Sequence, residues 1–176
     1  CDLEGGHRLE QIEGRIGIVS VAIKRKVSPA ADFAALLSLY CQFRSKPYAV
    51  ACSMTPKAGL LSLLASFCGR VPVRIHIFTG QVWVTRSGVK RWLLKMIDKL
   101  MACLATDLLA DSPSQREFLI AEGVVRPEKI QVLAGGSICG VDVGRFRARP
   151  GMRDSLRQEL GIPEDAVVVL FLGRMN

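Results

Sequence analysis

The sequence lacks most of the short motifs that mark metal sites, phosphate loops and membrane spans. Its six cysteines and two histidines are scattered, with no C-x-x-C pair and no histidine cluster, so no zinc site is expected. Neither the G-x-x-x-x-G-K-[ST] phosphate loop nor the G-x-G-x-x-G fingerprint occurs. No uninterrupted apolar run reaches the roughly 18 residues that a membrane-spanning helix requires, so any membrane contact is expected to be peripheral.

Acidic residues are fewer than basic ones. The 16 Asp and Glu residues stand against 24 Lys and Arg residues, which gives a formal net charge of +8. Such a balance suits nucleic acid, an anionic membrane surface or a phosphorylated ligand, and it also serves solubility alone. Aromatic residues make up only 6% of the chain and lie within apolar runs, so the aromatic-rich RNA-binding signature is missing and a nucleic-acid partner is not expected.

The composition is that of a folded protein in a reducing compartment. Of the 176 residues, 49% are apolar and 23% are charged, which is typical of globular domains. Most cysteines lie in apolar runs, where a free thiol behaves as a small hydrophobic residue, and this favours the cytoplasm. The chain opens without an initiator Met or a signal sequence, so we expect the native protein to begin before Cys1.

Strands and helices are predicted to alternate along the chain. Apolar, β-branched runs predict strands at 16–23, 48–53, 71–78, 107–110, 129–134 and 166–172. Helices are predicted at 29–43, 56–69, 88–105, 113–122 and 152–160, several of them opening with Ser-Pro or Thr-Pro. This alternation predicts right-handed crossovers and a Rossmann-like parallel α/β sheet.

Small, polar and basic residues follow the predicted strands. They are Ser53, Thr55, Lys57, Thr79, Gly80, Gln81, Ser112, Ser114, Gln115, Gly135, Gly136, Ser137, Gly173 and Arg174. In an open parallel sheet, ligands bind beyond the carboxyl ends of the strands. Helices that start at Pro56 and Pro113 aim unpaired N–H groups at this edge, which favours a phosphate or a sugar hydroxyl. Ser112 also suits a simple helix cap, and both interpretations stay open.

Few residues suggest acid–base chemistry. His76 lies inside a predicted strand and alternates with Arg74 and Phe78, so a structural histidine is favoured over a general base. Asp107 and Asp111 flank a short strand, where a lone carboxylate is more often a cap or a surface charge. No close pair of carboxylates indicates hydrolytic catalysis.

The predicted helix at 88–105 is amphipathic. An apolar stripe contains Val89, Leu93, Met96, Ile97, Leu100 and Leu104. Basic residues lie toward the other side, namely Lys90, Arg91, Lys95 and Lys99, with Arg86 just before the helix. Such a helix is suited to lie against anionic lipid headgroups. The alternative is an ordinary helix that packs its stripe on the core and exposes its charges to water.

Four blocks of the sequence resemble a known family. They are TPKAGLLSLLASFCGRVPVRIHIFTG, DLLADSPSQREFLIAEGVV, KIQVLAGGSICGVDVGRF and LGIPEDAVVVLFLGR, in that order. Together they resemble bacterial family 4 retaining glycosyltransferases of the GT-B fold, of the kind that build capsule, O-antigen or exopolysaccharide repeat units. The resemblance runs from about residue 14 to residue 176.

The resemblance implies two facing Rossmann-like domains, the first holding mainly a lipid-linked acceptor and the second a nucleotide sugar. Residues 1–144 then form the acceptor-side domain without its first strand, and residues 145–176 form the interdomain connection and the start of the donor-binding domain. The motif GVD at 140–142, followed by RF at 145–146, matches the entry to that connection. Gly173 and Arg174 match the start of the donor-site motif, whose arginine is expected to meet the diphosphate.

The sequence departs from the family pattern at one visible position. Many relatives carry a His-Gly pair where this chain has Thr79-Gly80, and His76, three positions earlier, does not inherit that role. The donor-site lysine and paired glutamates of the family are expected beyond Asn176. The chain by itself is therefore expected to be inactive.

The resemblance implies a retaining transferase that moves a hexosyl or N-acetylhexosaminyl group from a nucleoside-diphosphate sugar to a polyprenyl-linked acceptor, without a metal or other cofactor. Gly173 and Arg174 are the expected donor residues. The expected acceptor-side residues are Thr79, Gly80, Gln81 and Ser114, and the expected membrane-facing residues are Lys90, Arg91, Lys95 and Lys99. A cytoplasmic location at the inner face of the plasma membrane follows. The alternatives are a sugar-nucleotide epimerase and a non-catalytic membrane-surface or protein-binding module.

Overall fold

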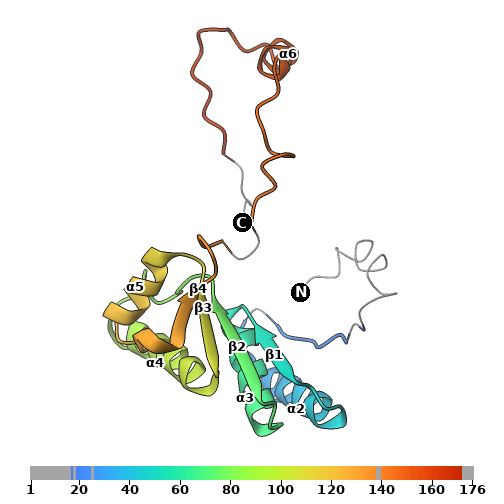
Figure 1. Cartoon of the computed structure of the whole chain (residues 1–176), viewed down its shortest axis with the longest axis vertical. Coiled ribbons are helices and arrows are strands. Elements are labelled where there is room, and N and C mark those ends of the chain that lie inside the picture. The colour runs from blue at the N-terminus through green and yellow to red at the C-terminus, as the bar shows by residue number, and fades with distance from the viewer. Residues whose placement is uncertain (1–16, 18, 25, 138–139, 172–176) are drawn as a thin grey trace. The chain divides into compact units, whose positions relative to one another are not determined.

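The structure is a computed structural model that describes residues 17, 19–24, 26–137 and 140–171. The chain divides into two compact units, Cys1–Ile138 and Cys139–Asn176. Figure 1 shows the sheet and its helices in the first unit, and the short helix labelled α6 in the second.

The first unit is built on a parallel sheet of four strands. They are β1 (Val50–Ser53), β2 (Val73–Phe78), β3 (Asp107–Ala110) and β4 (Ile130–Val132). The strands lie side by side in chain order, and every neighbouring pair is parallel. Ser53 pairs with His76, and Phe78 pairs with Ala110, so the ends of these strands reach one edge of the sheet. The predicted Rossmann-like α/β fold is confirmed.

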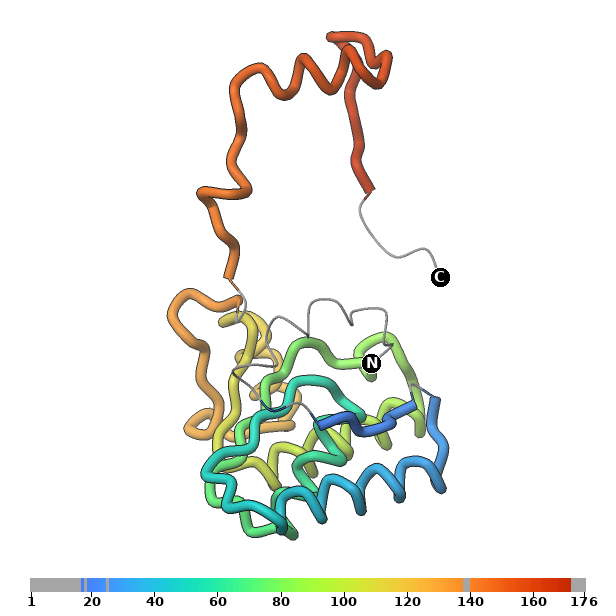
Figure 2. The backbone as a smooth tube through the Cα atoms, turned by 90° about the vertical axis from the view of Figure 1, so that its right-hand side faces the viewer, coloured from blue at the N-terminus to red at the C-terminus, as the bar shows by residue number. Residues whose placement is uncertain are grey.

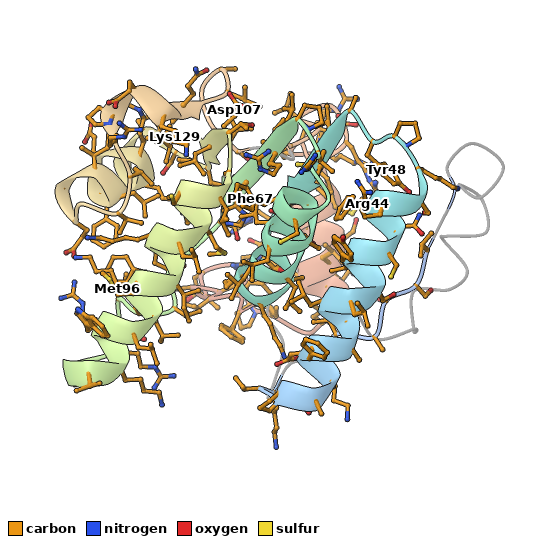
Figure 3. All side chains as sticks on the ribbon, turned by 90° about the horizontal axis from the view of Figure 1, so that it is seen from below. Arg44, Tyr48, Phe67, Met96, Asp107 and Lys129 are labelled. Atoms are coloured by element: carbon orange, nitrogen blue, oxygen red, sulfur yellow. The ribbon has the colours of Figure 1, made fainter. Side chains whose placement is uncertain are left out.

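Helices connect and cover the strands. They are α2 (Pro29–Ser45), α3 (Pro56–Cys68), α4 (Gly88–Leu104) and α5 (Pro113–Ala121), with a 3-10 turn η2 at Pro127–Lys129. Proline stands in the first turn of α2, α3 and α5, where its missing N–H leaves no helical hydrogen bond unmade. Seen from below, α2, α3 and α4 run next to one another in one layer (Figure 3), consistent with the contacts of α3 with both neighbours.

The core lies between the sheet and the helix layer. The strands contribute buried Phe78, Leu108, Ala110 and Ile130, and the helices contribute Leu63, Met101 and Leu119. The strand residues alternate along the chain and therefore point to one face of the sheet. Right-handed crossovers between successive strands place α3, α4 and α5 on that same face. The segments that follow the strands lie at the carboxyl edge of the sheet. Figure 2 traces the backbone of this unit from α2, in blue, onward.

Two predicted strands are wrong. The described residues of 16–23 and of 166–172 form no strand. A strand needs a hydrogen-bonded neighbour, and none of the described residues supplies one for either segment. The apolar run at 166–171 is instead exposed, with Val169 at 89% and Phe171 at 81%. Just after the first segment, the ammonium group of Lys57 donates to the carbonyl oxygens of Lys24 and Lys26, at 2.7 and 2.8 Å.

The predicted apolar stripe of α4 is buried only in part, at Leu104 and partly at Met96 and Ile97. Val89, Leu93 and Leu100 are exposed. The residues that α4 buries are Asp98, Met101, Ala102 and Leu104, with Leu94 and Ile97 partly buried beside them. The buried side of α4 thus includes Asp98, which accepts a hydrogen bond from the indole of Trp83.

The second unit holds α6 (Met152–Glu159) among its described residues. Gly151 precedes this helix with a φ of +77°, a conformation that favours glycine. The guanidinium group of Arg157 donates to the carbonyl oxygens of Pro163 and Ala166, the second at 2.6 Å. These contacts fold the segment after α6 back onto the helix.

Candidate acceptor-side site

Four loops define the candidate site at the carboxyl edge of the sheet. One follows each strand, and α3, α4 and α5 each begin at this edge because they follow β1, β2 and β3. All the expected acceptor-side residues lie in these loops or at a helix start. The structure thus brings Thr79, Gly80, Gln81 and Ser114 to one edge of one sheet.

The loop after β2 is open where the acceptor was expected. Thr79 and Gly80 are exposed, and a β-carbon built on Gly80 would meet no atom within 4 Å. Gln81 is half-buried, and its amide nitrogen has no hydrogen-bond partner among the residues that the structure describes. A buried amide donor without a partner is costly, because it has lost water and gained nothing in return. The loop therefore combines a buried amide donor that has no partner with an exposed, unobstructed backbone at Gly80.

Trp83 anchors this loop to α4. The indole is fully buried, and its Nε1–H donates to Oδ2 of Asp98 at 2.7 Å. The ring also stacks on Phe118 of α5, with centroids 5.5 Å apart. Burial raises the pKa of the Asp98 carboxyl, and the hydrogen bond from Trp83 partly offsets that rise. Sequence reasoning missed this anchor, although a tryptophan in a polar loop and a lone acid in a basic helix were visible signals.

The start of α5 is a closely hydrogen-bonded corner. The hydroxyl of Ser112 accepts from the backbone N–H of Gln115 at 3.1 Å, so Ser112 is a helix cap. The side-chain carbonyl of Gln115 accepts in return from the N–H of Asp111 at 2.7 Å. Ser114 is exposed, with its hydroxyl 3.0 Å from that of Ser112. Of the two serines of this corner, Ser114 is the exposed one and Ser112 is half-buried.

The glycine-rich loop after β4 closes on the same corner. The N–H of Ser137 donates to the carbonyl oxygen of Asp111 at 2.7 Å. Gly136 has a φ of +100°, and a β-carbon there would lie 2.6 Å from that same carbonyl oxygen. Only glycine fits this approach. The loop therefore fixes the position of the α5 start relative to β4.

His76 has a structural role, as the sequence favoured. Its side chain is 1% exposed, with Nδ1 2.8 Å from the hydroxyl of Ser53. Burial lowers the pKa of the imidazole to about 4, so His76 is neutral at pH 7. Gly59 of α3 lies directly over the ring, since a β-carbon on Gly59 would be 2.7 Å from its Cε1. The ring is packed into the helix–sheet interface.

Lys57 is engaged within the fold. Besides the carbonyl contacts described above, its ammonium group lies 2.6 Å from Oδ1 of Asp32 on α2. The hydrogen bond from Lys57 lowers the pKa of Asp32 below its usual value. Lys57 therefore joins α3 to α2 and to the segment that precedes α2.

The four basic residues expected to face a membrane divide into two pairs. Arg91 and Lys95 both contact Oε2 of Glu122, the residue that directly follows α5, at 3.0 and 2.7 Å, and both lie over the ring of Trp83. The hydrogen bond from Lys95, with the nearby charge of Arg91, lowers the pKa of Glu122. Lys90 is exposed and Lys99 is half-buried on α4. The first pair joins α4 to α5.

The expected donor residues, Gly173 and Arg174, lie outside the described residues. Within the described ranges, no three His, Cys, Asp or Glu side chains come together as metal ligands. In the same part of the chain, no helix has the length and apolarity needed to cross a membrane.

The comparisons with known proteins agree with this parallel α/β architecture. Residues 2–136 match the model of the glycosyl transferase 4-like domain. The chain belongs to this glycosyltransferase family. The match spans the sheet, its helices and all four expected acceptor-side residues.

Curated relatives cover nearly all of this family member's chain. It is 30% identical over 171 residues to the capsular polysaccharide biosynthesis glycosyltransferase CapM of Staphylococcus aureus, which covers 97% of the chain and 44% of CapM. It is 26% identical over 155 residues to the UDP-Gal:alpha-D-GlcNAc-diphosphoundecaprenol alpha-1,3-galactosyltransferase of Escherichia coli, covering 86% of the chain and 38% of that enzyme. The chain thus spans less than half the length of these relatives. Neither relative is an epimerase or a binding module, so those alternatives gain no support.

A solved structure supports the fold. The structure of HepE from Anabaena in complex with UDP superposes with a TM-score of 0.56 and 19% sequence identity. The superposition covers 73% of this chain and 32% of the HepE chain. At this identity the likeness concerns the fold alone.

Proposed function

We propose that this chain is the acceptor-side part of an enzyme that transfers a sugar from a nucleoside-diphosphate sugar to a lipid-linked acceptor in cell-surface polysaccharide synthesis. The observation that carries the proposal is the family match across the whole sheet. The names of the two relatives supply the substrate classes, a capsular polysaccharide and a sugar on diphosphoundecaprenol.

The acceptor site is proposed at the loop after β2 and the start of α5. Gln81 has a buried amide donor without a partner, and Ser114 has an exposed hydroxyl. Both groups suit the hydroxyls of a sugar. The open space over Gly80 lets the acceptor approach the backbone closely, and Thr79 adds a second exposed hydroxyl.

The donor site is proposed to involve Gly173 and Arg174. A guanidinium group is planar and donates in a fork that matches diphosphate oxygens. In this proposal, residues 1–144 hold the acceptor and residues 145–176 begin the donor domain. The transfer retains the anomeric configuration, moves a hexosyl or N-acetylhexosaminyl group, and uses the nucleoside-diphosphate sugar as co-substrate without a protein-bound metal.

The proposed location is the cytoplasm, at the inner face of the plasma membrane. Four cysteines of the described part, Cys41, Cys52, Cys68 and Cys103, are exposed free thiols. Free surface thiols persist best in a reducing compartment.

The test uses the protein encoded by the complete reading frame around this segment. It is incubated with a panel of labelled nucleoside-diphosphate sugars and a sugar-diphosphopolyprenol acceptor, and lipid-extractable label is counted. Transfer to the lipid, with the same anomeric configuration in donor and product by NMR, supports the proposal. Absence of transfer from every donor of the panel to this acceptor, with the folded protein present, overturns it.

Site variants then separate the two substrates. Gln81→Ala and Ser114→Ala are expected to raise the KM for the acceptor about tenfold each and to leave the KM for the donor unchanged, because each removes one hydrogen bond of about 1.4 kcal/mol. Ser38→Ala, at an exposed position of α2, is the matched control and should behave as the unchanged protein. An increase in the donor KM instead would assign these residues to the other substrate.

A further inference from the structure

The indole of Trp83 is held by side chains from two helices. Its Nε1–H donates to Oδ2 of Asp98 on α4 at 2.7 Å, and its ring stacks on Phe118 of α5 with centroids 5.5 Å apart. Arg91 and Lys95 of α4 lie over the ring, 5.3 and 5.6 Å from its centroid. With an exposure of 0%, Trp83 is a fixed point of the first unit.

A carboxylate keeps the two cations over this ring. Arg91 and Lys95 are one helical turn apart, and two like charges at this spacing destabilise a helix. Glu122, which directly follows α5, contacts both of them at 3.0 and 2.7 Å and so offsets the repulsion. The charges therefore help to clamp the indole between the two helices.

The loop after β2 is a short span between two buried residues. Phe78, the last residue of β2, is 3% exposed, and the four residues 79–82 separate it from Trp83. The backbone N–H of Val84 donates back to the carbonyl oxygen of Gln81 at 3.2 Å, which closes a turn around the indole. A span of this length has few conformations once both of its ends are fixed.

Gln81 is held in this span in an unfavourable state. Its amide nitrogen is buried and has no hydrogen-bond partner among the residues that the structure describes. Such a donor costs free energy, and a free loop would turn it toward water. Both sequence neighbours, Gly80 and Val82, are exposed, so water is close in either direction. The fixed ends of the span explain why the amide stays unpaired.

We propose that the hydrogen bond between Trp83 and Asp98 is a positioning contact, which holds the amide of Gln81 unpaired until a sugar hydroxyl of the acceptor accepts its hydrogen bond. Trp83 and Asp98 are 0% and 5% exposed, so neither of them touches the acceptor. The inference rests on the proposed function for the identity of the ligand. A loop that is already ordered loses less entropy on binding, so the contact acts on acceptor affinity through Gln81.

Steady-state kinetics of the protein encoded by the complete reading frame test the contact. Asp98→Leu removes the acceptor of the hydrogen bond at similar size, whereas Asp98→Asn keeps a carbonyl oxygen for the indole. Asp98→Leu is expected to raise the KM for the sugar-diphosphopolyprenol acceptor about tenfold and to leave the KM for the donor unchanged. Asp98→Asn should keep both KM values within about twofold. Trp83→Phe removes the donor of the same bond and should match Asp98→Leu.

A double-mutant cycle shows whether the contact acts through Gln81. Asp98→Leu combined with Gln81→Ala is expected to raise the acceptor KM about 10- to 20-fold, whereas independent effects would multiply to about a hundredfold. Gly59→Ala, which overpacks His76 beneath α3, is the control for a general loss of stability. It should leave the KM values for both substrates unchanged.

Hydrogen exchange in the 176-residue chain measures the loop without enzymatic activity. The N–H groups of Val84 and Arg86 close two turns around Trp83, with hydrogen bonds of 3.2 and 3.0 Å. Their exchange, followed by NMR, should be about fivefold or more faster in Asp98→Leu and unchanged in Asp98→Asn. The N–H of Asp32, in the first turn of α2, is the internal reference and should exchange equally in all three proteins.

Each readout has a result that overturns the inference. These results are an acceptor KM in Asp98→Leu within about twofold of the unchanged protein, independent effects in the cycle, and unchanged exchange at Val84 and Arg86. An equal rise of the acceptor KM in Gly59→Ala would also overturn it, because the effect would then follow stability alone. If the exchange changes as expected but the complete protein transfers no sugar, the proposed function fails and the contact still positions the loop.

Discussion

The buried histidine predicts a loss of stability in mild acid. His76 lies under α3 with Ser53 as its hydrogen-bond partner, and burial lowers its pKa from 6.5 to about 4. The unfolded chain binds a proton at this residue near pH 6.5, whereas the folded protein does not do so until about pH 4. Folding therefore competes with protonation, and the free energy of unfolding falls as the pH drops through this window.

The size of the loss follows from the two pKa values. Each unit of difference corresponds to about 1.4 kcal/mol. Between pH 7 and pH 5 the unfolded chain becomes almost fully protonated at His76 while the folded protein stays neutral. The expected decrease in the free energy of unfolding over this interval is about 2 kcal/mol. The pKa values of Glu122 and Asp32 are lowered, so these carboxylates lose their stabilising effect below this interval.

Urea unfolding at a series of pH values measures the effect. The control is His76→Gln, which keeps a hydrogen-bonding side chain beside Ser53 and removes the titration. The variant has its own stability at pH 7, so the comparison concerns the change with pH in each protein. The unchanged chain should lose about 2 kcal/mol more than the variant between pH 7 and pH 5. Asp98 contributes the opposite trend to both proteins and cancels in the difference.

An equal decrease in the free energy of unfolding in the two proteins between pH 7 and pH 5 would contradict this account of His76. So would an NMR titration that places the imidazole pKa of the folded protein at or above 6. Either result would mean that water reaches the ring, and the packing of α3 over β2 would then be looser than Gly59 indicates.

Three further predictions concern the same framework. Gly59→Ala should lower the free energy of unfolding by about 1–2 kcal/mol, because the added methyl group would overpack against His76 and this cost outweighs the gain in helix propensity. A midpoint of urea unfolding at or above that of the unchanged chain would contradict this prediction. Asp98→Asn should raise the midpoint of thermal unfolding at pH 7, because the amide oxygen still accepts from Trp83 and the buried charge is removed. The gain should disappear in acid, where Asp98 itself is protonated. Ser112→Ala should cost about 1 kcal/mol in urea unfolding through loss of the α5 cap, while an unchanged midpoint would show that water replaces it.

Most of the sheet and its helices could be predicted from the sequence because their signals are local. Ser-Pro or Thr-Pro pairs mark the starts of α2, α3 and α5, and short apolar runs mark the strands. The carboxyl edge followed from chain order alone, since each loop after a parallel strand must reach it. For that reason Thr79, Gln81 and Ser114 could be assigned to one edge without coordinates.

The anchor beneath the site could not be predicted in the same way. Trp83 and Asp98 are 15 residues apart, in a loop and in a helix. No periodicity links two such positions, and the carboxylate would ordinarily be expected on the surface. Their hydrogen bond forms only because the loop folds back over α4 and removes both groups from water.

Local sequence patterns were enough to predict the order of strands and helices in the sheet, the polar residues at its carboxyl edge and the amphipathic character of α4. Tertiary structure alone decided which side of α4 is buried, because a helical period fixes the spacing of a stripe and not its partner. Asp98 turned inward to meet Trp83, Glu122 drew Arg91 and Lys95 toward α5, and Val89, Trp92 and Leu93 were left outside. The apolar run at 166–171 forms no strand for a related reason. A strand exists only where the backbone of a neighbouring segment completes its hydrogen bonds, and this run has no such neighbour among the described residues.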